Sequence, residues 1–305
     1  MPPLLPLFRN RRRKRRHKEQ VESVGLNRVV NLSLLLEERL LAGKEPGVGN
    51  SCAHEIVISL TTYDKRIDNV CLTIESLMRQ TLKADRIVLN VAAQDFSPET
   101  LPVSLQLQHQ RGLEIVYVDE DLGPYTKFFY TLQKYPDALV ITADDDLLYP
   151  MDMVAQLYSA YLRQPDMIHC HRAHRILNDD SGKLLPYKQW DFNTGKTKPG
   201  LDIFPTGVGG VLYFPGCFHP DIFNKELFLQ LAPNADDIWL KAMSLKNGTL
   251  CAKIADDRDW SMRFHLIPGS QKTNLKRKNK AKRGGNDEKI ARVFAHYNLS
   301  ELLSN

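Results

Sequence analysis

One stretch limits the possible folds of this chain more than any other. Residues 138–150 read Ala-Leu-Val-Ile-Thr-Ala-Asp-Asp-Asp-Leu-Leu-Tyr-Pro, so an apolar, β-prone run is followed at once by Asp144, Asp145 and Asp146. This order predicts a buried strand whose C-terminal end delivers carboxylates to a crevice. Adjacent aspartates repel one another unless positive charge lies among them, and hard divalent cations bind such oxygens. We therefore expect a metal site, because a helix N-cap would explain one aspartate but not three.

The spacing of the three aspartates separates their roles. In an extended segment alternate side chains share a face, so Asp144 and Asp146 converge on one ion or one ribose, and Asp145 points elsewhere. The apolar-periodic segment that follows predicts a helix over residues 150–163, with Pro150 at its first position.

The body of the chain alternates between strand and helix patterns. Strands are predicted at residues 55–60, 86–91, 112–118 and 138–142, and helices at residues 69–80 and 236–245. Such alternation predicts an α/β domain, residues 51–270, with a central, mostly parallel sheet flanked by helices.

The two ends of the chain are strongly basic, and the body is acidic. Eight Lys or Arg lie in residues 9–18 and seven in residues 272–283, although the formal net charge is only +5. We expect a disordered basic tail at residues 1–20, an amphipathic helix and linker at 21–50, and a basic loop with a C-terminal helix at 271–305. The tails suit an anionic membrane or plain solvation, and the acidic body excludes a uniformly basic nucleic-acid binder.

Cysteine usage and hydropathy suggest where the protein resides. The five cysteines are odd in number and form no C-x-x-C pair, which favours a reduced, cytoplasmic compartment. We see no signal peptide, and the most apolar stretch, residues 203–218, is broken by Pro and Gly. The expected location is cytoplasmic, with peripheral contact at the inner face of the membrane as the role of the basic tails.

Three segments together resemble a known superfamily. Ile-Thr-Ala-Asp-Asp-Asp at 141–146 resembles the D-x-D signature of GT-A glycosyltransferases. Asp-Leu-Gly-Pro-Tyr-Thr-Lys at 121–127 and Ile-Ser-Leu-Thr-Thr-Tyr-Asp-Lys-Arg-Ile at 58–67 look like a bacterial, family 2-like branch that acts on cell-surface glycans. The resemblance covers about residues 54–265. It implies a GT-A (Rossmann-like) single domain and a hexosyltransferase that uses Mn2+ or Mg2+.

The resemblance also implies a substrate class and residue roles. A sugar would pass from a nucleotide-sugar donor, probably UDP-linked, to a glycan or lipid-linked acceptor in surface polysaccharide or lipopolysaccharide synthesis. Inversion is expected, because a separate base is available. The implied metal ligands are Asp146, Asp144 and His265; the donor-binding residues are Thr61, Tyr63, Arg66, Lys127, Asp144, Asp145, Gly209 and Gly210; the base is Asp237, with Asp236 as second choice.

Other interpretations stay open or are set aside. Asp236 and Asp237 also fit the N-terminus of an ordinary helix, and Lys127 fits an ordinary surface lysine.

His169-Cys170-His171 with His174 is rejected as a zinc site, because Cys170 on a strand would point away from both neighbours. The alternative functions are a polyanion-binding protein and a sugar nucleotidyltransferase, although the latter would want a Gly-rich loop after the first strand. The basic loop at 271–283 is a hypothetical lid over the donor.

Overall fold

A computed structural model of the chain describes residues 5–270 and 285–303, with side chains from residue 23 onward except that of Asp64. The basic loop that we predict as a lid, residues 271–283, lies outside these residues. None of the helices within the described ranges is both long and apolar enough to cross a membrane.

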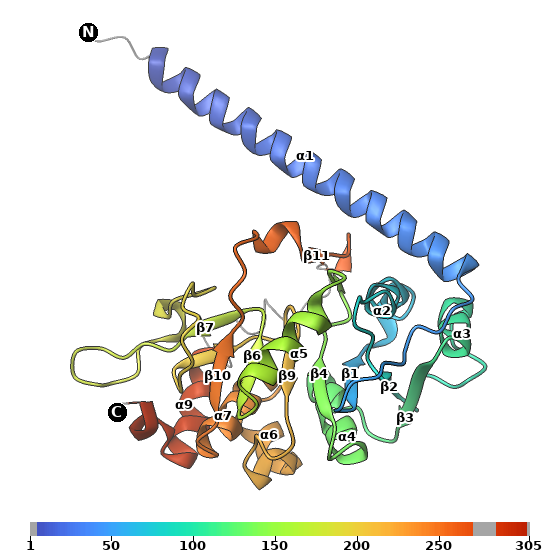
Figure 1. Cartoon of the computed structure of the whole chain (residues 1–305). Helices are drawn as coiled ribbons and strands as arrows, with labels where there is room; N and C mark the ends of the chain where they lie inside the picture. The colour runs from blue at the N-terminus through green and yellow to red at the C-terminus, as the bar shows by residue number, and fades with distance from the viewer. Residues whose placement is uncertain (1–4, 271–284, 304–305) are drawn as a thin grey trace.

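A seven-stranded sheet forms the centre of the molecule (Figure 1). Its strand order is β10-β6-β9-β4-β1-β2-β3, and β9 is antiparallel to both neighbours while every other pairing is parallel. The predicted α/β domain with a mostly parallel sheet is confirmed. The strands are β1 (Ile56–Thr61), β2 (Arg86–Ala92), β3 (Leu113–Val118), β4 (Leu139–Thr142), β6 (Met167–Cys170), β9 (Val211–Tyr213) and β10 (Leu250–Lys253).

Two small antiparallel pairs and several helices surround this sheet. The pairs are β5 (Leu147–Leu148) with β11 (His265–Leu266), and β7 (Ala173–Arg175) with β8 (Ile203–Pro205). The α-helices are α1 (Leu5–Ala42), α2 (Val70–Met78), α3 (Val103–Gln110), α4 (Thr126–Lys134), α5 (Met153–Arg163), α6 (Lys225–Leu231), α7 (Asp236–Lys246) and α9 (Asn286–Tyr297). Short 3-10 turns lie at Asp64–Arg66, Gly123–Tyr125, Tyr187–Gln189, Pro220–Phe223, Trp260–Met262 and Leu299–Leu303.

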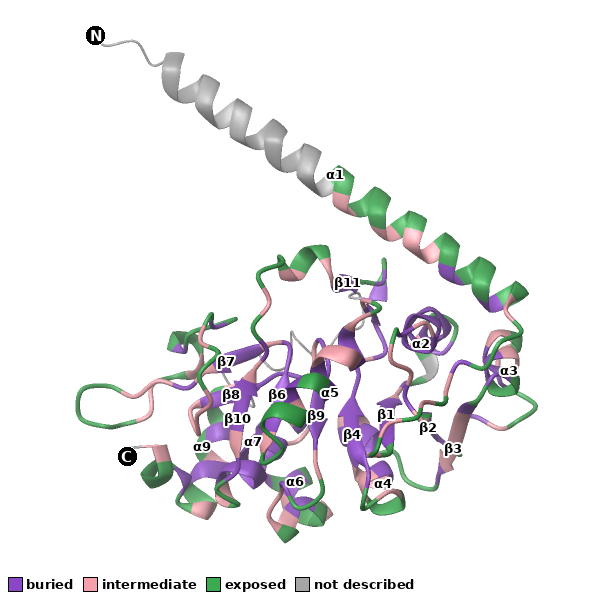
Figure 2. Ribbon diagram, viewed as in Figure 1, coloured by how far each residue is buried: buried purple, intermediate pink, exposed green. Residues whose placement is uncertain are grey.

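The alternation of side chains along the strands explains how the core is divided. In β1, Ile56, Ile58 and Leu60 pack with α2, α3 and α5, whereas Val57 faces the opposite side in a smaller cluster near α4. A third apolar cluster lies under α6, α7 and α9. Figure 2 shows the central strands buried and the edge strand β3 partly exposed, as a sheet covered on both faces requires.

Two helix starts differ from those predicted. Helix α1 begins at Leu5, so residues 5–20 are helical and the expected disordered tail is not found there. Arg, Lys, Gln and Glu are good helix formers, and no Pro or Gly interrupts residues 7–24, so local propensity outweighs the charge repulsion. Helix α5 begins at Met153 with Asp152 at the N-cap position, so Pro150 lies before the helix instead of starting it.

Candidate functional site

Four predicted site residues meet beyond the carboxyl ends of the central strands. The ammonium of Lys127 lies 3.0 Å from Asp144 Oδ1 and 2.7 Å from Asp236 Oδ2. Asp237 follows in the first turn of α7, and its Oδ1 accepts a hydrogen bond from the backbone N–H of Gly207 at 3.0 Å. One buried lysine therefore faces three carboxylates that come from distant parts of the sequence.

Local structure fixes Asp144 just after β4. Its backbone N–H donates to the hydroxyl of Tyr149 at 2.7 Å, and Tyr149 is almost fully buried. The preceding residue, Ala143, donates its N–H to the Ser59 carbonyl in β1. Asp144 is thus held at the carboxyl end of the sheet, as the sequence predicts, with its side chain one quarter exposed.

Lys127 is not a surface lysine, because buried polar contacts hold its helix onto the sheet. It lies in the first turn of α4 and is only 6% exposed. The Ser59 hydroxyl donates to the Lys127 carbonyl and lies 2.6 Å from the Thr131 hydroxyl. Asn90 of β2 donates to the same Thr131 hydroxyl at 3.1 Å. These hydrogen bonds join α4 to β1 and β2, and so fix the position of the Lys127 side chain relative to the sheet.

Neither Asp236 nor Asp237 is a helix cap. Ala235 occupies the N-cap position of α7, and no side chain caps this helix. The N-cap assignment is therefore wrong, although both aspartates do lie at the N-terminus of a helix, in the first turn of α7, as the alternative interpretation expects. Asp236 is buried against Lys127, while Asp237 remains partly exposed.

Burial and the neighbouring charges shift the pKa values of these groups. Burial, followed by the neighbouring Asp236, raises the pKa of Asp237 well above its ordinary value. Burial alone would lower the pKa of Lys127, but Asp144, Asp236 and Asp237 together raise it. Lys127 therefore stays charged, and Asp237 is the carboxylate whose proton affinity approaches that of a neutral-pH base.

Gly207 lies where these side chains converge. A Cβ built on this residue would lie 3.0 Å from Lys127 Nζ and 3.2 Å from both Asp144 Oδ1 and Asp237 Oδ1. Any side chain here would push the charged groups apart. The sequence analysis did not single out Gly207, although the Thr-Gly-Val-Gly-Gly run at 206–210 was the available signal.

Asp145 and Asp146 both contact Arg66. Asp145 accepts from Arg66 at 2.5 Å and from Thr62 at 2.7 Å, while Asp146 Oδ2 lies 3.2 Å from the same guanidinium. Asp145 and Asp146 therefore share Arg66, while Asp144 contacts Lys127, so the predicted alternation of Asp144 and Asp146 against Asp145 is not found. Residues 145 and 146 form a turn, in which side chains do not alternate as they do along a strand. Burial and then Asp144 raise the pKa of Asp146 to about 6, so the arginine does not fully neutralise these acids.

His265 lies in the strand paired with the segment after the aspartates. It is opposite Leu148, and the next-but-one residue, Ile267, donates its N–H to the Asp146 carbonyl at 2.9 Å. Burial lowers the pKa of His265, so its imidazole is neutral at neutral pH, as a metal ligand must be. Among the residues whose side chains the structure describes, no three His, Cys, Asp or Glu side chains surround a common metal position. The metal ligand set stays a prediction.

The remaining predicted donor-binding residues differ in exposure: Tyr63 is exposed, and the others contact the sheet or the core. Tyr63 is 36% exposed beside the Arg66 guanidinium, whereas the Thr61 hydroxyl donates to the Asn90 carbonyl of the next strand. Gly209 has φ +108° and faces the indole of Trp260. Gly210 packs toward Met153 of α5, which gives it a packing role. Of these residues Tyr63 is exposed, whereas Gly209 is buried beneath Trp260.

Sequence reasoning missed a second polar region beside the 206–210 loop. A cavity of about 150 Å³ adjoins this loop, and several of the side chains that line it are basic. The only hint in the sequence was the Arg and Trp content of residues 256–263, which has no recognisable motif. The lining residues are His171, Arg172, Asn193, Lys253, Asp256, Arg258, Trp260 and Arg263.

Comparison with known proteins gives distant structural likenesses. The sequence matches no family model and no curated protein. Among solved structures, it is similar to a mannosyltransferase from Pyrobaculum calidifontis in complex with GDP-Man and Mn2+, at 15% identity and TM-score 0.41 over 78% of this chain and 66% of that one. S. aureus TarS (residues 1–349) matches at 12% identity and TM-score 0.47, over 70% of this chain and 60% of that one.

A nucleotidyltransferase-type enzyme is similar to about the same degree. The 4-diphosphocytidyl-2C-methyl-D-erythritol synthase from Anaerococcus prevotii matches at 15% identity and TM-score 0.44, over 72% of this chain and 94% of that one. This chain spans less than two thirds of the mannosyltransferase and of TarS. Similarity this low concerns the fold alone and does not identify an activity.

Proposed function

We propose that this protein is a metal-dependent glycosyltransferase that moves a sugar from a nucleotide-sugar donor, preferably UDP-linked, to a glycan or lipid-linked acceptor. The observation that carries the proposal is the group of Lys127, Asp144, Asp236 and Asp237. It lies where the strand order reverses, since β1 is followed by β2 and β3 on one side and by β4 on the other. Open α/β sheets bind their ligands at such a switch point.

Asp237 serves as the general base. Its carboxylate takes the proton of an acceptor hydroxyl while that oxygen bonds to the anomeric carbon of the donor sugar, and the bond from this carbon to the diphosphate oxygen breaks. The nucleoside diphosphate leaves with the bonding electrons. Attack on the face opposite the leaving group inverts the anomeric centre. Asp236 holds Lys127 in place, and Lys127 balances negative charge at the site.

The carboxylates after β4 fit a divalent cation. Asp144 and Asp146 offer hard oxygens, and burial, followed by the neighbouring Asp144, raises the pKa of Asp146, so a cation here would relieve a carboxylate that is costly to ionise. Asp144, Asp146 and His265 would hold Mn2+ or Mg2+, with donor phosphates completing the shell. The bound ion would neutralise the diphosphate as it leaves. Arg66 and Tyr63 border the nucleotide end of this site.

The cellular setting follows from the same proposal. We place the reaction in surface polysaccharide or lipopolysaccharide synthesis on the cytoplasmic side, with peripheral contact between the basic ends and an anionic membrane. This part rests on the sequence resemblance and on the composition of residues 9–18 and 272–283.

Calorimetric binding and a donor screen test the proposal. UDP, GDP and CDP are titrated into the protein with Mn2+ and with EDTA, and a panel of nucleotide sugars is assayed for release of the nucleoside diphosphate. We expect one nucleotide to bind only with the metal, and the matching sugar donor to be hydrolysed. Release of pyrophosphate from a nucleoside triphosphate and a sugar phosphate would instead establish a nucleotidyltransferase, and no binding of any nucleotide would overturn both.

A further inference from the structure

The cavity of about 150 Å³ beside the 206–210 loop, here called the basic pocket, has an unusual charge distribution. Four of its eight lining residues are Arg or Lys, and only Asp256 is acidic. At roughly 10–15 Å³ for one water position, the pocket has room for a group much larger than a single ion. It requires an explanation, because cations without partners are poorly tolerated inside proteins.

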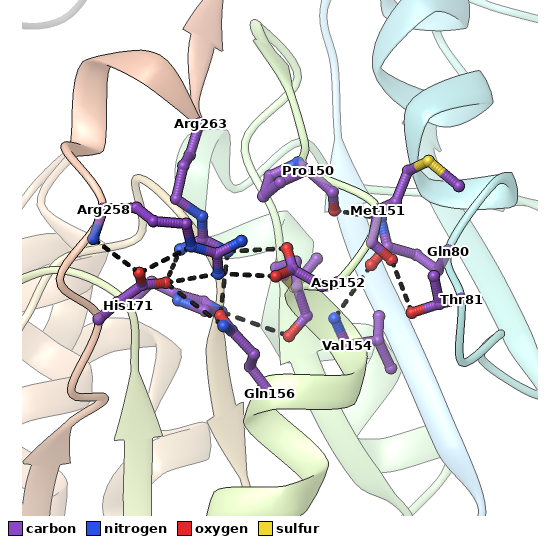
Figure 3. Close-up of polar contacts among 12 residues, drawn as sticks. Gln80, Thr81, Pro150, Met151, Asp152, Val154, Gln156, His171, Arg258 and Arg263 are labelled. Carbon is purple, nitrogen blue, oxygen red and sulfur yellow. Dashed lines mark hydrogen bonds and ion pairs between the residues drawn. The ribbon is translucent and has the colours of Figure 1, made fainter.

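Two of its arginines are fully matched by carboxylates. Arg258 lies 2.7 Å from Asp152 and 2.8 Å from Asp256, and Arg263 bonds the same two aspartates at 2.8 and 2.6 Å. Figure 3 shows Arg258 and Arg263 converging with Asp152 and Gln156 at the start of α5. This network forms a rigid wall and contributes little net charge.

The other two cations have no carboxylate partner among the described residues. Arg172 is half-buried and donates to the Thr206 hydroxyl at 3.0 Å, which leaves most of its five N–H donors unused. Lys253 is half-buried at the end of β10 and forms no ion pair within the described ranges. His171 adds no charge at neutral pH, because burial lowers its pKa to about 4. The net positive charge of the pocket therefore comes from Arg172 and Lys253.

The pocket adjoins the proposed base through one loop. Arg172 bonds Thr206, and the next residue, Gly207, donates to Asp237. At the other end of the loop Gly209 lies against Trp260, where a Cβ would approach the indole to 2.1 Å. Trp260 in turn stacks on Phe264 at 3.9 Å. A ligand in the pocket would lie on the Asp237 side of the site and beside an aromatic ring.

We propose that the basic pocket binds a phosphate or carboxylate group carried by the acceptor sugar, with Arg172 and Lys253 as its ligands, so that a hydroxyl of that sugar faces Asp237. The inference rests on the proposed function and specifies its acceptor class as an anionic glycan. The donor's diphosphate belongs to the carboxylate and metal side, near Asp144 and Lys127. Lys253→Gln and Arg172→Gln test the two ligands.

The test compares three probes of similar size: glucose 6-phosphate, glucuronate and glucose. Each is titrated into the full chain by ligand-observed NMR, both without nucleotide and with saturating UDP and Mn2+. We expect one or both anionic probes to bind at least about tenfold tighter than glucose, as charge-assisted hydrogen bonds predict. Which of the two binds tighter distinguishes phosphate from carboxylate.

Matched variants connect the preference to the pocket. Lys253→Gln and Arg172→Gln should each weaken binding of the preferred anionic probe about tenfold, whereas Lys44→Gln, an exposed lysine outside the pocket, should not change it. Thermal melting checks that each variant is folded, and Lys253→Gln, at the end of its strand, serves alone if Arg172→Gln does not fold. UDP affinity should stay the same in all three.

Two results would overturn the inference. One is equal affinity for glucose and the anionic probes, or anion binding that Lys253→Gln leaves intact. The other is loss of UDP affinity in step with loss of anion affinity, which would assign the pocket to the donor diphosphate. If UDP fails to bind even the unaltered protein, the proposed function fails, while the titrations without nucleotide still report on the pocket.

Discussion

Two buried charge clusters in this molecule are built in opposite ways. In the first, Glu75 of α2 is fully buried and receives two hydrogen bonds from Arg111, at 2.8 and 3.1 Å, and one from Gln108 at 3.3 Å. Arg39 of α1 lies 3.8 Å from the same carboxylate. In the second, Lys127 faces Asp144, Asp236 and Asp237.

We interpret the Glu75–Arg111 pair as structural, and the group around Lys127 as the proposed functional site. The Glu75 carboxylate is satisfied by planar donors and lies where α1, α2 and α3 meet. Around Lys127 carboxylates outnumber the lysine, and burial, followed by the neighbouring Asp236, raises the pKa of Asp237. Clusters that are left unbalanced inside a cleft mark functional sites more often than balanced ones. Each prediction below alters one cluster and compares the response with the other.

The largest expected effect on stability is at the balanced cluster, which is Glu75 with Arg111, Gln108 and Arg39. Glu75→Gln leaves the Arg111 guanidinium buried without its carboxylate, which should lower the free energy of unfolding by about 3–5 kcal/mol. Urea denaturation measures this. The matched control is Glu55→Gln, which removes the exposed partner of Arg86 and should change stability by less than about 1 kcal/mol. Equal, small losses in both variants would show that burial does not distinguish the two pairs.

An intermediate effect, on activity, is expected at the unbalanced cluster, which is Lys127 with Asp144, Asp236 and Asp237. Gly207→Ala places a methyl group against Lys127, Asp144 and Asp237, so kcat should fall at least about tenfold as their positions shift. Gly195→Ala is the control, because a Cβ there meets nothing within 4 Å. Steady-state donor turnover is the measurement. Unchanged kcat in Gly207→Ala would mean that the spacing of these groups does not matter.

The smallest expected effect is on how stability changes with pH, compared between Asp237→Asn and the unaltered protein. Because the folded-state pKa of Asp237 lies above its unfolded value, ionising it in the folded protein costs stability as the pH rises through the folded pKa. Asp237→Asn removes this cost, so the variant should gain stability relative to the unaltered protein between pH 5 and 8. Melting temperatures across that range measure it, and turnover by the unaltered protein should rise over the same interval. A difference in melting temperature between the two proteins that stays constant from pH 5 to 8 would contradict the raised pKa of Asp237.

Patterns local in sequence predicted much of the fold. The alternating strand and helix signals placed β1, β2, β3 and β4 within one or two residues, and the run after β4 placed the aspartates at the end of a strand. The start of α1 was wrong because the repulsion of its basic residues was weighted above their helix propensity.

Contacts between distant segments could not be predicted in the same way. Arg66 meets Asp145 across 79 residues of sequence, and Lys127 meets Asp236 across more than 100. Only the packing of helices on the sheet brings these pairs together. Arg172 and Lys253 carried no motif at all, because the pocket they share exists only after β6, β10 and the 206–210 loop are in place.

The central claim is that the unbalanced cluster serves chemistry and the balanced one serves stability. The most direct test is metal-dependent donor hydrolysis by Asp237→Asn, with the free energy of unfolding measured on the same preparation. Asparagine keeps the acceptor for the Gly207 N–H, so we predict a loss of turnover of about a hundred- to ten-thousand-fold with no loss of stability at neutral pH. Full activity, or destabilisation as large as that expected for Glu75→Gln, would contradict the account.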